Sequence, residues 1–153
     1  MPANPDYSDL FSIFNAERVE YLVAGAHAVI FYAEPRYTKD LDVWVNPTPE
    51  NARRVWRALA RFGAPLSGVT EADFTDGTLV YQIGVEPNRI DILMGLEPLR
   101  FESAWAARTT TAYDGVPIGV LSRDDLIRCK RAAGRPQDLL DIQRLELDDG
   151  ATP

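Results

Sequence analysis

Two aspartates, Asp40 and Asp42, are the residues of this 153-residue chain whose type and spacing best suit chemistry. Leu41, Val43 and Val45 alternate with them, and a period of two is typical of a β-strand. Both carboxylates then share one face, opposite an apolar face that contacts a core. Like charges at neighbouring positions of one face repel each other unless a cation lies between them, and Mg²⁺ prefers such oxygen ligands. The stretch therefore predicts a strand at the edge of a cavity with a bound metal, and a solvated edge strand is the alternative.

Composition limits the class of protein. With 46% hydrophobic and 25% charged residues, the sequence is that of an ordinary globular protein, and its length predicts one domain over residues 1–153. A net charge of −7 argues against a broad nucleic-acid-binding surface, although a local basic groove is compatible with it. Cys129 is the single cysteine, so an internal disulfide is excluded. Without a secretory segment or an apolar run that could span a bilayer, we expect a cytoplasmic protein with no membrane partner.

The elements that must position the two aspartates follow from periodicity and turn residues. The pattern predicts helices over residues 6–18, 26–33, 49–62, 101–108, 122–134 and 136–147. It predicts strands over residues 21–24, 37–45, 79–85, 89–94, 109–113 and 116–120, the last four as two hairpins. Residues 66–77 fit either a loop or a short helix. The order strand, Gly25-Ala26 turn, helix thus precedes the strand of Asp40 and Asp42.

A third acid, Asp91, lies between Ile90 and Ile92 on another expected strand. Its apolar neighbours favour a buried strand, where an acid without a partner is costly. Asp91 is therefore either a further metal ligand or the partner of a base such as Arg89.

Taken together, Gly25-Ala26, the Asp40-x-Asp42 pair and Asp91 resemble the motif of the polymerase-beta-type nucleotidyltransferase superfamily. That motif is a hydrophobic strand, glycine followed by glycine or serine, a spacer, Asp-hydrophobic-Asp, and a third carboxylate on a neighbouring strand. The resemblance extends over residues 19–145. It implies an α/β (α+β) fold, in which helices flank a mixed, mostly antiparallel sheet and further helices follow at the C-terminal end.

The run VAGAHAVIFYAEPRYTKDLDVWV resembles small single-domain members of bacteria and archaea, some of which are toxins of toxin–antitoxin or phage-defence systems. Those members often carry Arg-x-Thr before the carboxylates, as Arg36 and Thr38 do here. The tail LIRCKRAAGRPQDLLDI is similar to theirs at four residues: Lys130, Arg135, Asp138 and Asp141.

The resemblance implies transfer of a nucleoside monophosphate from an NTP to an acceptor hydroxyl, with release of pyrophosphate. Two Mg²⁺ ions would be bridged by Asp40 and Asp42, and Asp91 would bind the ion nearer the attacking hydroxyl. The backbone N–H groups of Gly25 and Ala26 would contact the phosphates at the positive end of a helix. Side chains predicted to contact phosphate are those of Arg36, Thr38 and Lys130.

Ala26 departs from the family motif, because it offers neither a hydroxyl nor the freedom of glycine. Two alternatives to an enzyme therefore stay open: a catalytically degenerate nucleotide-binding module that acts through a protein partner, and a structural α/β domain with an acidic edge. For the enzyme, the acceptor could be tRNA or another RNA, a protein, or a small molecule such as an antibiotic. A homodimer or a cognate partner protein is expected to complete the acceptor site.

Other residues have structural interpretations that we prefer. His27 is predicted to be a hydrogen-bonded structural histidine, and Trp44 is expected to pack on a helix rather than stack on a base. Lys130 either extends its ammonium to solvent or directs it at an internal anion. We expect Arg135, Asp138 and Asp141 to form an ion-pair network between the last two helices. A solvated helix face is predicted for Arg53, Arg54, Arg57 and Arg61.

Overall fold

The computed structural model describes residues 3–33 and 40–151. Its helices are α1 (Pro5–Ala16), α2 (Gly25–Tyr32), α3 (Pro49–Phe62), the 3₁₀ helix η1 (Glu71–Thr75), α4 (Phe101–Ala107), α5 (Arg123–Ala133) and α6 (Pro136–Ala151). Its strands are β1 (Tyr21–Ala24), β2 (Leu41–Val45), β3 (Val80–Ile83), β4 (Ile90–Leu93), β5 (Thr109–Tyr113) and β6 (Val116–Val120). Each predicted element has a counterpart, although residues 37–39 of the strand predicted over 37–45 lie outside the described residues.

The ends of several elements reflect local chemistry. The side chain of Asn4 caps α1, and Pro5 takes the first helical position. Thr48 caps α3, and Gly63 ends that helix in the left-handed region, with φ 92°. In the ambiguous stretch 66–77, a reciprocal capping box between Thr70 and Asp73 begins η1.

The described strands form one six-stranded sheet in the order β3-β4-β2-β1-β6-β5. β2 pairs with β4 and β1 with β6 in parallel, whereas the other three neighbouring pairs are antiparallel. This is the mixed, mostly antiparallel α/β architecture predicted from the sequence. The strand of Asp42 lies near the middle of the sheet, so the predicted alternative of a solvated edge strand is wrong.

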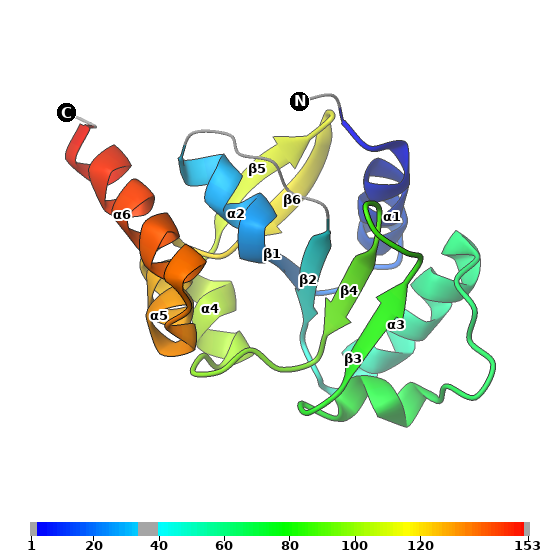
Figure 1. Ribbon diagram of the computed structural model, residues 1–153. Helices are drawn as coiled ribbons and strands as arrows, with labels where there is room; N and C mark the ends of the chain where they lie inside the picture. Colours follow the sequence, from blue (N-terminus) through cyan, green and yellow to red (C-terminus); the bar gives the residue numbers. More distant parts are fainter. Residues whose placement is uncertain (1–2, 34–39, 152–153) are drawn as a thin grey trace.

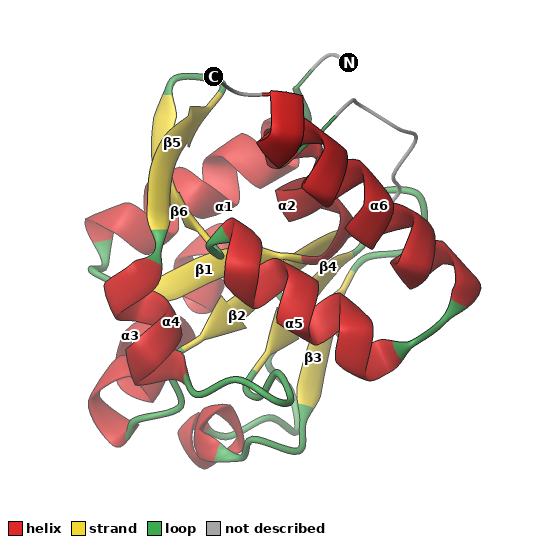
Figure 2. Ribbon diagram, turned by 90° about the vertical axis from the view of Figure 1, so that its left-hand side faces the viewer, coloured by secondary structure: helices red, strands yellow, loops and turns green. Residues whose placement is uncertain are grey.

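Helices cover both faces of the sheet (Figures 1 and 2). Figure 2 shows α2, α5 and α6 in front of the sheet and α1 and α3 behind it. β2 is consequently buried on both sides, with Val43 0% and Trp44 2% exposed. Within the described part of the chain, every helix is too short or too polar to cross a lipid bilayer.

The buried side chain of Asn51, in the first turn of α3, joins that helix to the sheet. Its Oδ1 accepts the N–H of Glu20 at 2.8 Å, and its Nδ2 donates to the carbonyls of Glu20 at 3.0 Å and Asn46 at 2.9 Å. Glu20 precedes β1 and Asn46 follows β2, so one amide fixes the start of one strand against the end of the other.

Candidate active site

β2 and β4 bring the predicted site acids side by side. In this parallel pair Leu41 lies opposite Ile90, and Asp42 lies opposite Asp91. Asp40 and Arg89 each precede the Leu41–Ile90 pair by one residue. Because every second residue of a strand faces the same way, Asp40, Asp42, Asp91 and Arg89 occupy adjacent positions on one face of the sheet.

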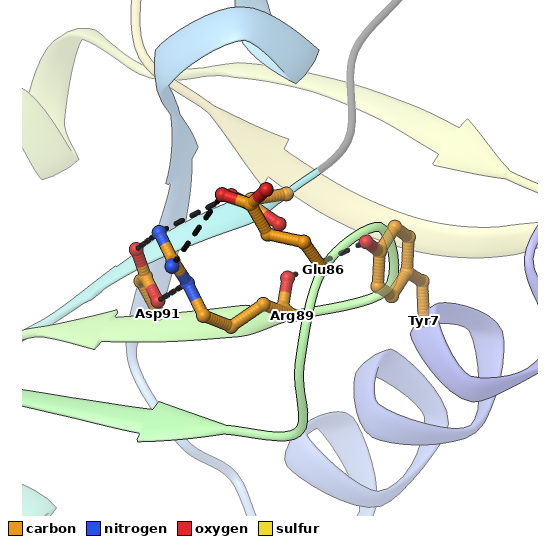
Figure 3. Close-up of polar contacts among 5 residues, drawn as sticks. Tyr7, Glu86, Arg89 and Asp91 are labelled. Carbon is orange, nitrogen blue, oxygen red and sulfur yellow. Dashed lines mark hydrogen bonds and ion pairs between the residues drawn. The ribbon is translucent and has the colours of Figure 1, made fainter.

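The Arg89 side chain lies between two of these acids (Figure 3). Its Nη2 is 3.1 Å from Asp40 Oδ2, and its Nε donates to Asp91 Oδ1 at 2.9 Å. A second bond joins Nη2 to Asp91 Oδ2 at 3.3 Å, and Nη1 is 3.8 Å from Glu86 Oε1. The ion pair between Asp91 and Arg89, one of the two sequence interpretations, is therefore present. The additional contact with Asp40 depends on cross-strand register, which the sequence alone does not reveal.

Even with Arg89 in place, the acids lack positive charge. Burial, and after it the negative charge of Asp91, raise the pKa of Asp42 to about 6, although Lys130 acts in the opposite direction. Asp40 Oδ1 is buried and has no hydrogen-bond partner. A buried carboxylate oxygen without a partner is unfavourable, so this face of the sheet favours an additional cation.

The turn at Gly25 packs directly on Asp42. Gly25 has φ +63°, and a Cβ added to it would lie 2.2 Å from Asp42 Oδ2, so a side chain is excluded here. Gly25 begins α2, and the preceding N-cap residue, Ala24, makes no side-chain cap bond. The first N–H groups of α2 therefore have no capping side chain, and the positive end of this helix lies beside the carboxylate.

A pocket of about 330 Å³ opens at this turn. Among its lining residues are Gly25, Asp42, Glu97, Lys130, Arg135 and Asp138. Ala26 occupies the second position of α2, directly after the turn. The pocket thus combines a helix N-terminus, three carboxylates and two basic residues. Such a mixture suits a polyanion that carries a metal.

Lys130 directs its ammonium inward rather than toward solvent. It is 7% exposed, and its Nζ is 3.5 Å from Asp138 Oδ1 and 3.3 Å from Asp141 Oδ2. Arg135 Nε donates to Asp138 Oδ2 at 2.7 Å. Burial raises the pKa of Asp138, but the hydrogen bonds from Arg135 and the charge of Lys130 outweigh it and hold this pKa below its usual value. The predicted ion-pair network of Arg135, Asp138 and Asp141 is present, with Lys130 as the additional member that joins Asp141 to Asp138.

Whether the acids fit a metal depends on Arg89. In the described ranges, 3–33 and 40–151, no group of three or more histidine, cysteine, aspartate or glutamate side chains is arranged to hold a metal ion. The donor chemistry nevertheless suits a hard cation, because Asp42 and Asp91 are register partners and Asp40 Oδ1 has no partner. The positively charged Arg89 guanidinium lies between Asp40 and Asp91, where a metal ion would have to bind.

Several other residues named in the sequence analysis pack or pair within the fold, away from the pocket. Trp44 packs edge-on against Phe101 of α4 with a ring-centroid distance of 5.0 Å, so helix packing is confirmed. The side chains of Arg57 and Arg61 are more than half exposed and lie 3.9 and 3.8 Å from Glu17, as expected for a solvated helix face.

His27 differs from its prediction. Its ring packs edge-on against Tyr7 at 5.4 Å, but its Nε2 is buried without the hydrogen-bond partner that we expected. Burial lowers the pKa of this imidazole, against the charge of Asp40. Arg36 and Thr38, the remaining predicted phosphate contacts, lie outside the described residues.

Sequence reasoning missed two contributors. Glu97, in the segment between β4 and α4, lines the pocket, and no pattern around it indicates this. Tyr7 of α1 donates from its hydroxyl to the Arg89 carbonyl at 3.4 Å, which links the first helix to the site (Figure 3). Arg89 itself had a signal, because it stands two residues before Asp91 and so shares its strand face.

Comparisons with known proteins concern the fold. No protein-family model matches the chain, and a sequence comparison with curated proteins finds no match. The structure is similar to the lincomycin-bound crystal structure of the lincosamide antibiotic adenylyltransferase LnuA, with TM-score 0.59 and 14% identity over 95% of this chain and 98% of that one. It is also similar to the solution structure of the antibiotic-resistance factor ANT(2'')-Ia, with TM-score 0.62 and 12% identity over 95% and 82% of the two chains. A third similar structure is that of an antigenic nucleotidyltransferase-like protein from Paracoccidioides brasiliensis, with TM-score 0.57 and 13% identity over 97% and 78%. The chain therefore has the fold of the polymerase-beta-type nucleotidyltransferases, as the resemblance in its sequence implies.

Proposed function

We propose that this protein is a Mg²⁺-dependent nucleotidyltransferase that moves a nucleoside monophosphate from an NTP to an acceptor hydroxyl. The observation that carries the proposal is the contact between the Gly25 turn and Asp42, whose register partner is Asp91. A helix N-terminus suited to phosphates and a set of carboxylates suited to metals thus meet at one pocket. The fold shared with LnuA and ANT(2'')-Ia supports the same reaction class.

The proposed roles follow from position. The N–H groups of Gly25 and Ala26 would hold the phosphates, and Asp42, which lines the pocket, would hold the metal together with Asp40. Asp91 lies on the neighbouring strand, where it would bind the metal, orient the acceptor hydroxyl and accept its proton. The acceptor oxygen forms a bond to the α-phosphorus as the bond to pyrophosphate breaks. Bound Mg²⁺ would supply charge neutralisation for the leaving pyrophosphate.

Lys130 lies beside Asp42 and could exchange one of its α6 carboxylates for the leaving pyrophosphate. Arg36 and Thr38 remain proposed phosphate contacts on the basis of the sequence motif. The acceptor is proposed as RNA or protein if the toxin-like role implied by the motif holds. LnuA and ANT(2'')-Ia are named for antibiotics, which makes a small-molecule hydroxyl the competing proposal. A second copy or a partner protein would complete the acceptor site.

The test uses the full chain with each α-³²P-labelled NTP and Mg²⁺, offered total tRNA, extract proteins or lincomycin in separate reactions. Transfer of label to one acceptor class is expected, and Asp42→Asn and Asp91→Asn should each lower it by about a hundredfold or more, because each removes a metal ligand. Asp9→Asn, an equal charge change on an exposed residue of α1, should leave the rate unchanged. Equal rates in Asp42→Asn and the wild type would contradict the proposal.

A second candidate is favoured by Ala26, which lacks the serine hydroxyl or second glycine of the motif. It is a nucleotide-binding module without transferase activity that acts through a protein partner. Calorimetric NTP binding that depends on Asp42, together with no label transfer to any acceptor, would support this candidate over the enzyme.

A further inference from the structure

Among the described residues of this strand face, Arg89 alone carries a charge opposite to that of its neighbours Asp40, Asp42 and Asp91. We propose that Arg89 is a displaceable counter-ion: it neutralises Asp40 and Asp91 while the site holds no divalent cation, and it leaves them for Glu86 when one binds. This inference rests on the proposed function for the identity of the site, and it adds a residue that controls how the site is loaded.

The first step of the argument is that Arg89 and a metal ion need the same oxygens. Arg89 contacts Asp40 Oδ2 at 3.1 Å and both oxygens of Asp91, at 2.9 and 3.3 Å. An ion shared by Asp40, Asp42 and Asp91 must bind to atoms that now accept these bonds. A guanidinium remains charged at any pH that the protein tolerates, so deprotonation cannot remove the competition. The side chain has to move.

The second step is that the side chain can move while the backbone stays. The Arg89 carbonyl accepts the N–H of Leu41 at 3.0 Å, in the ladder between β4 and β2, and the Tyr7 hydroxyl at 3.4 Å. The side chain itself is 28% exposed, unlike the buried cations of a closed ion pair. Solvent therefore reaches the guanidinium, and its departure needs no change in strand pairing.

The third step is the destination. Glu86 Oε1 is already 3.8 Å from Arg89 Nη1, and its side chain is 54% exposed at the turn between β3 and β4. Glu86 belongs to the turn and not to either strand, and it is not one of the proposed metal ligands. The guanidinium can strengthen this contact as it leaves Asp91, so its charge remains paired throughout. The consequence is weak binding of a free metal ion, which must first displace Arg89.

The test measures Mn²⁺ binding to the full chain without nucleotide. The electron paramagnetic resonance signal of free Mn²⁺ reports how much of the ion remains unbound. Arg89→Gln removes the competing charge and should bind Mn²⁺ about tenfold more tightly, the equivalent of one charge-assisted hydrogen bond. Glu86→Gln removes the destination and should bind it about twofold more weakly. Arg89→Lys retains the positive charge, so its Mn²⁺ affinity should be closer to that of the wild type than the affinity of Arg89→Gln is. Arg131→Gln, which breaks an exposed pair with Glu146, is the matched control and should bind as the wild type does.

A second measurement needs no substitution of Arg89. In the wild-type protein the Nε–H resonance of Arg89 should be visible in the metal-free state, and titration with Mg²⁺ should shift it or broaden it through faster exchange with water. Equal or weaker Mn²⁺ binding by Arg89→Gln, with an Nε–H resonance that Mg²⁺ does not change, would overturn the inference. Label transfer by the wild type would then leave the proposed function standing. Conversely, tighter Mn²⁺ binding by Arg89→Gln without label transfer would support the inference and reject the enzyme.

Discussion

Two clusters of charged side chains lie on the same side of the sheet, and in each of them one base contacts at least two acids. In one, Arg89 contacts Asp40 and Asp91; in the other, Lys130 contacts Asp138 and Asp141. The Arg89 side chain is 28% exposed, whereas that of Lys130 is 9% exposed and Asp138 is fully buried. Asp138 also accepts hydrogen bonds from Arg135, but Asp40 Oδ1 accepts none.

The difference separates two uses of an ion pair. In the cluster between α5 and α6 the Lys130 and Asp138 side chains are buried and the acids are satisfied, so this closed cluster stabilises the packing of two helices. The cluster between β2 and β4 is open and incompletely satisfied, so it can exchange its cation at small cost. Burial and unmet hydrogen bonds, rather than the number of charges, indicate which cluster functions in binding.

The largest expected effect comes from breaking the closed cluster. Asp138→Ala leaves Lys130 buried with one acid instead of two and removes the acceptor of Arg135, so the free energy of unfolding should fall by about 3–5 kcal/mol. Urea unfolding followed by circular dichroism measures it. The matched control is Glu146→Ala, which breaks an exposed pair with Arg131 and should cost less than about 1 kcal/mol. A loss for Asp138→Ala as small as that of the control would remove the distinction between the clusters.

The next effect tests the open cluster through pH. The folded-state pKa of Asp42 is about 6, above its ordinary value of 3.8, so the metal-free folded protein binds this proton more tightly than the unfolded chain does. Stability from this group is therefore present at low pH and is lost as pH rises from about 4 through 6. Asp42→Asn removes that loss, and it should raise the free energy of unfolding at pH 7 by at most about 3 kcal/mol, with little change at pH 4.

The measurement is chemical denaturation of wild type and Asp42→Asn at a series of pH values in the presence of EDTA. Asp9→Asn on α1, an equal charge change at an exposed residue, serves as the control. If Asp42→Asn were less stable than the wild type at pH 7, the charged Asp42 carboxylate would have favourable partners in the folded protein, as Asp138 has in the closed cluster.

The smallest effect concerns the turn that faces the open cluster. Gly25→Ala places a Cβ within 2.2 Å of Asp42 Oδ2 at φ +63°, so it should lower the free energy of unfolding by about 2 kcal/mol. Gly63→Ala is its matched control, because that glycine has φ +92° with nothing within 4 Å of the added atom. It should cost about 1 kcal/mol. Equal losses in thermal unfolding would show that the Asp42 contact is not tight.

Much of the fold could be predicted from the sequence because its elements have local causes. Thr48 and Pro49 define the start of α3, and the alternation around Asp42 defines β2. The family motif also indicated that Gly25 and Asp42 belong to one site, and the structure places them in contact. These predictions needed only spacing and residue type.

The rest depended on contacts between distant parts of the chain. Arg89 reaches Asp40 because β4 is parallel to β2 in one particular register, and register is not encoded near either residue. His27 was expected to have a hydrogen-bond partner, but its neighbour is the ring of Tyr7, which comes from another helix. For Lys130 the sequence left both solvent and an internal anion open, and its pairing with Asp138 and Asp141 became evident only from the packing of α6 on α5.

The amide of Asn51 has a consequence at the opposite end of the strand that it fixes. By tying Asn46 and Glu20 to α3, it secures β2 beyond its last residue, away from Asp40 and Asp42. The backbone of the site is thus preorganised before any ligand arrives. Binding energy from a cation or nucleotide then has to reorient only side chains, so the affinity of the site is set by rotamer changes and charge exchange rather than by folding of the platform.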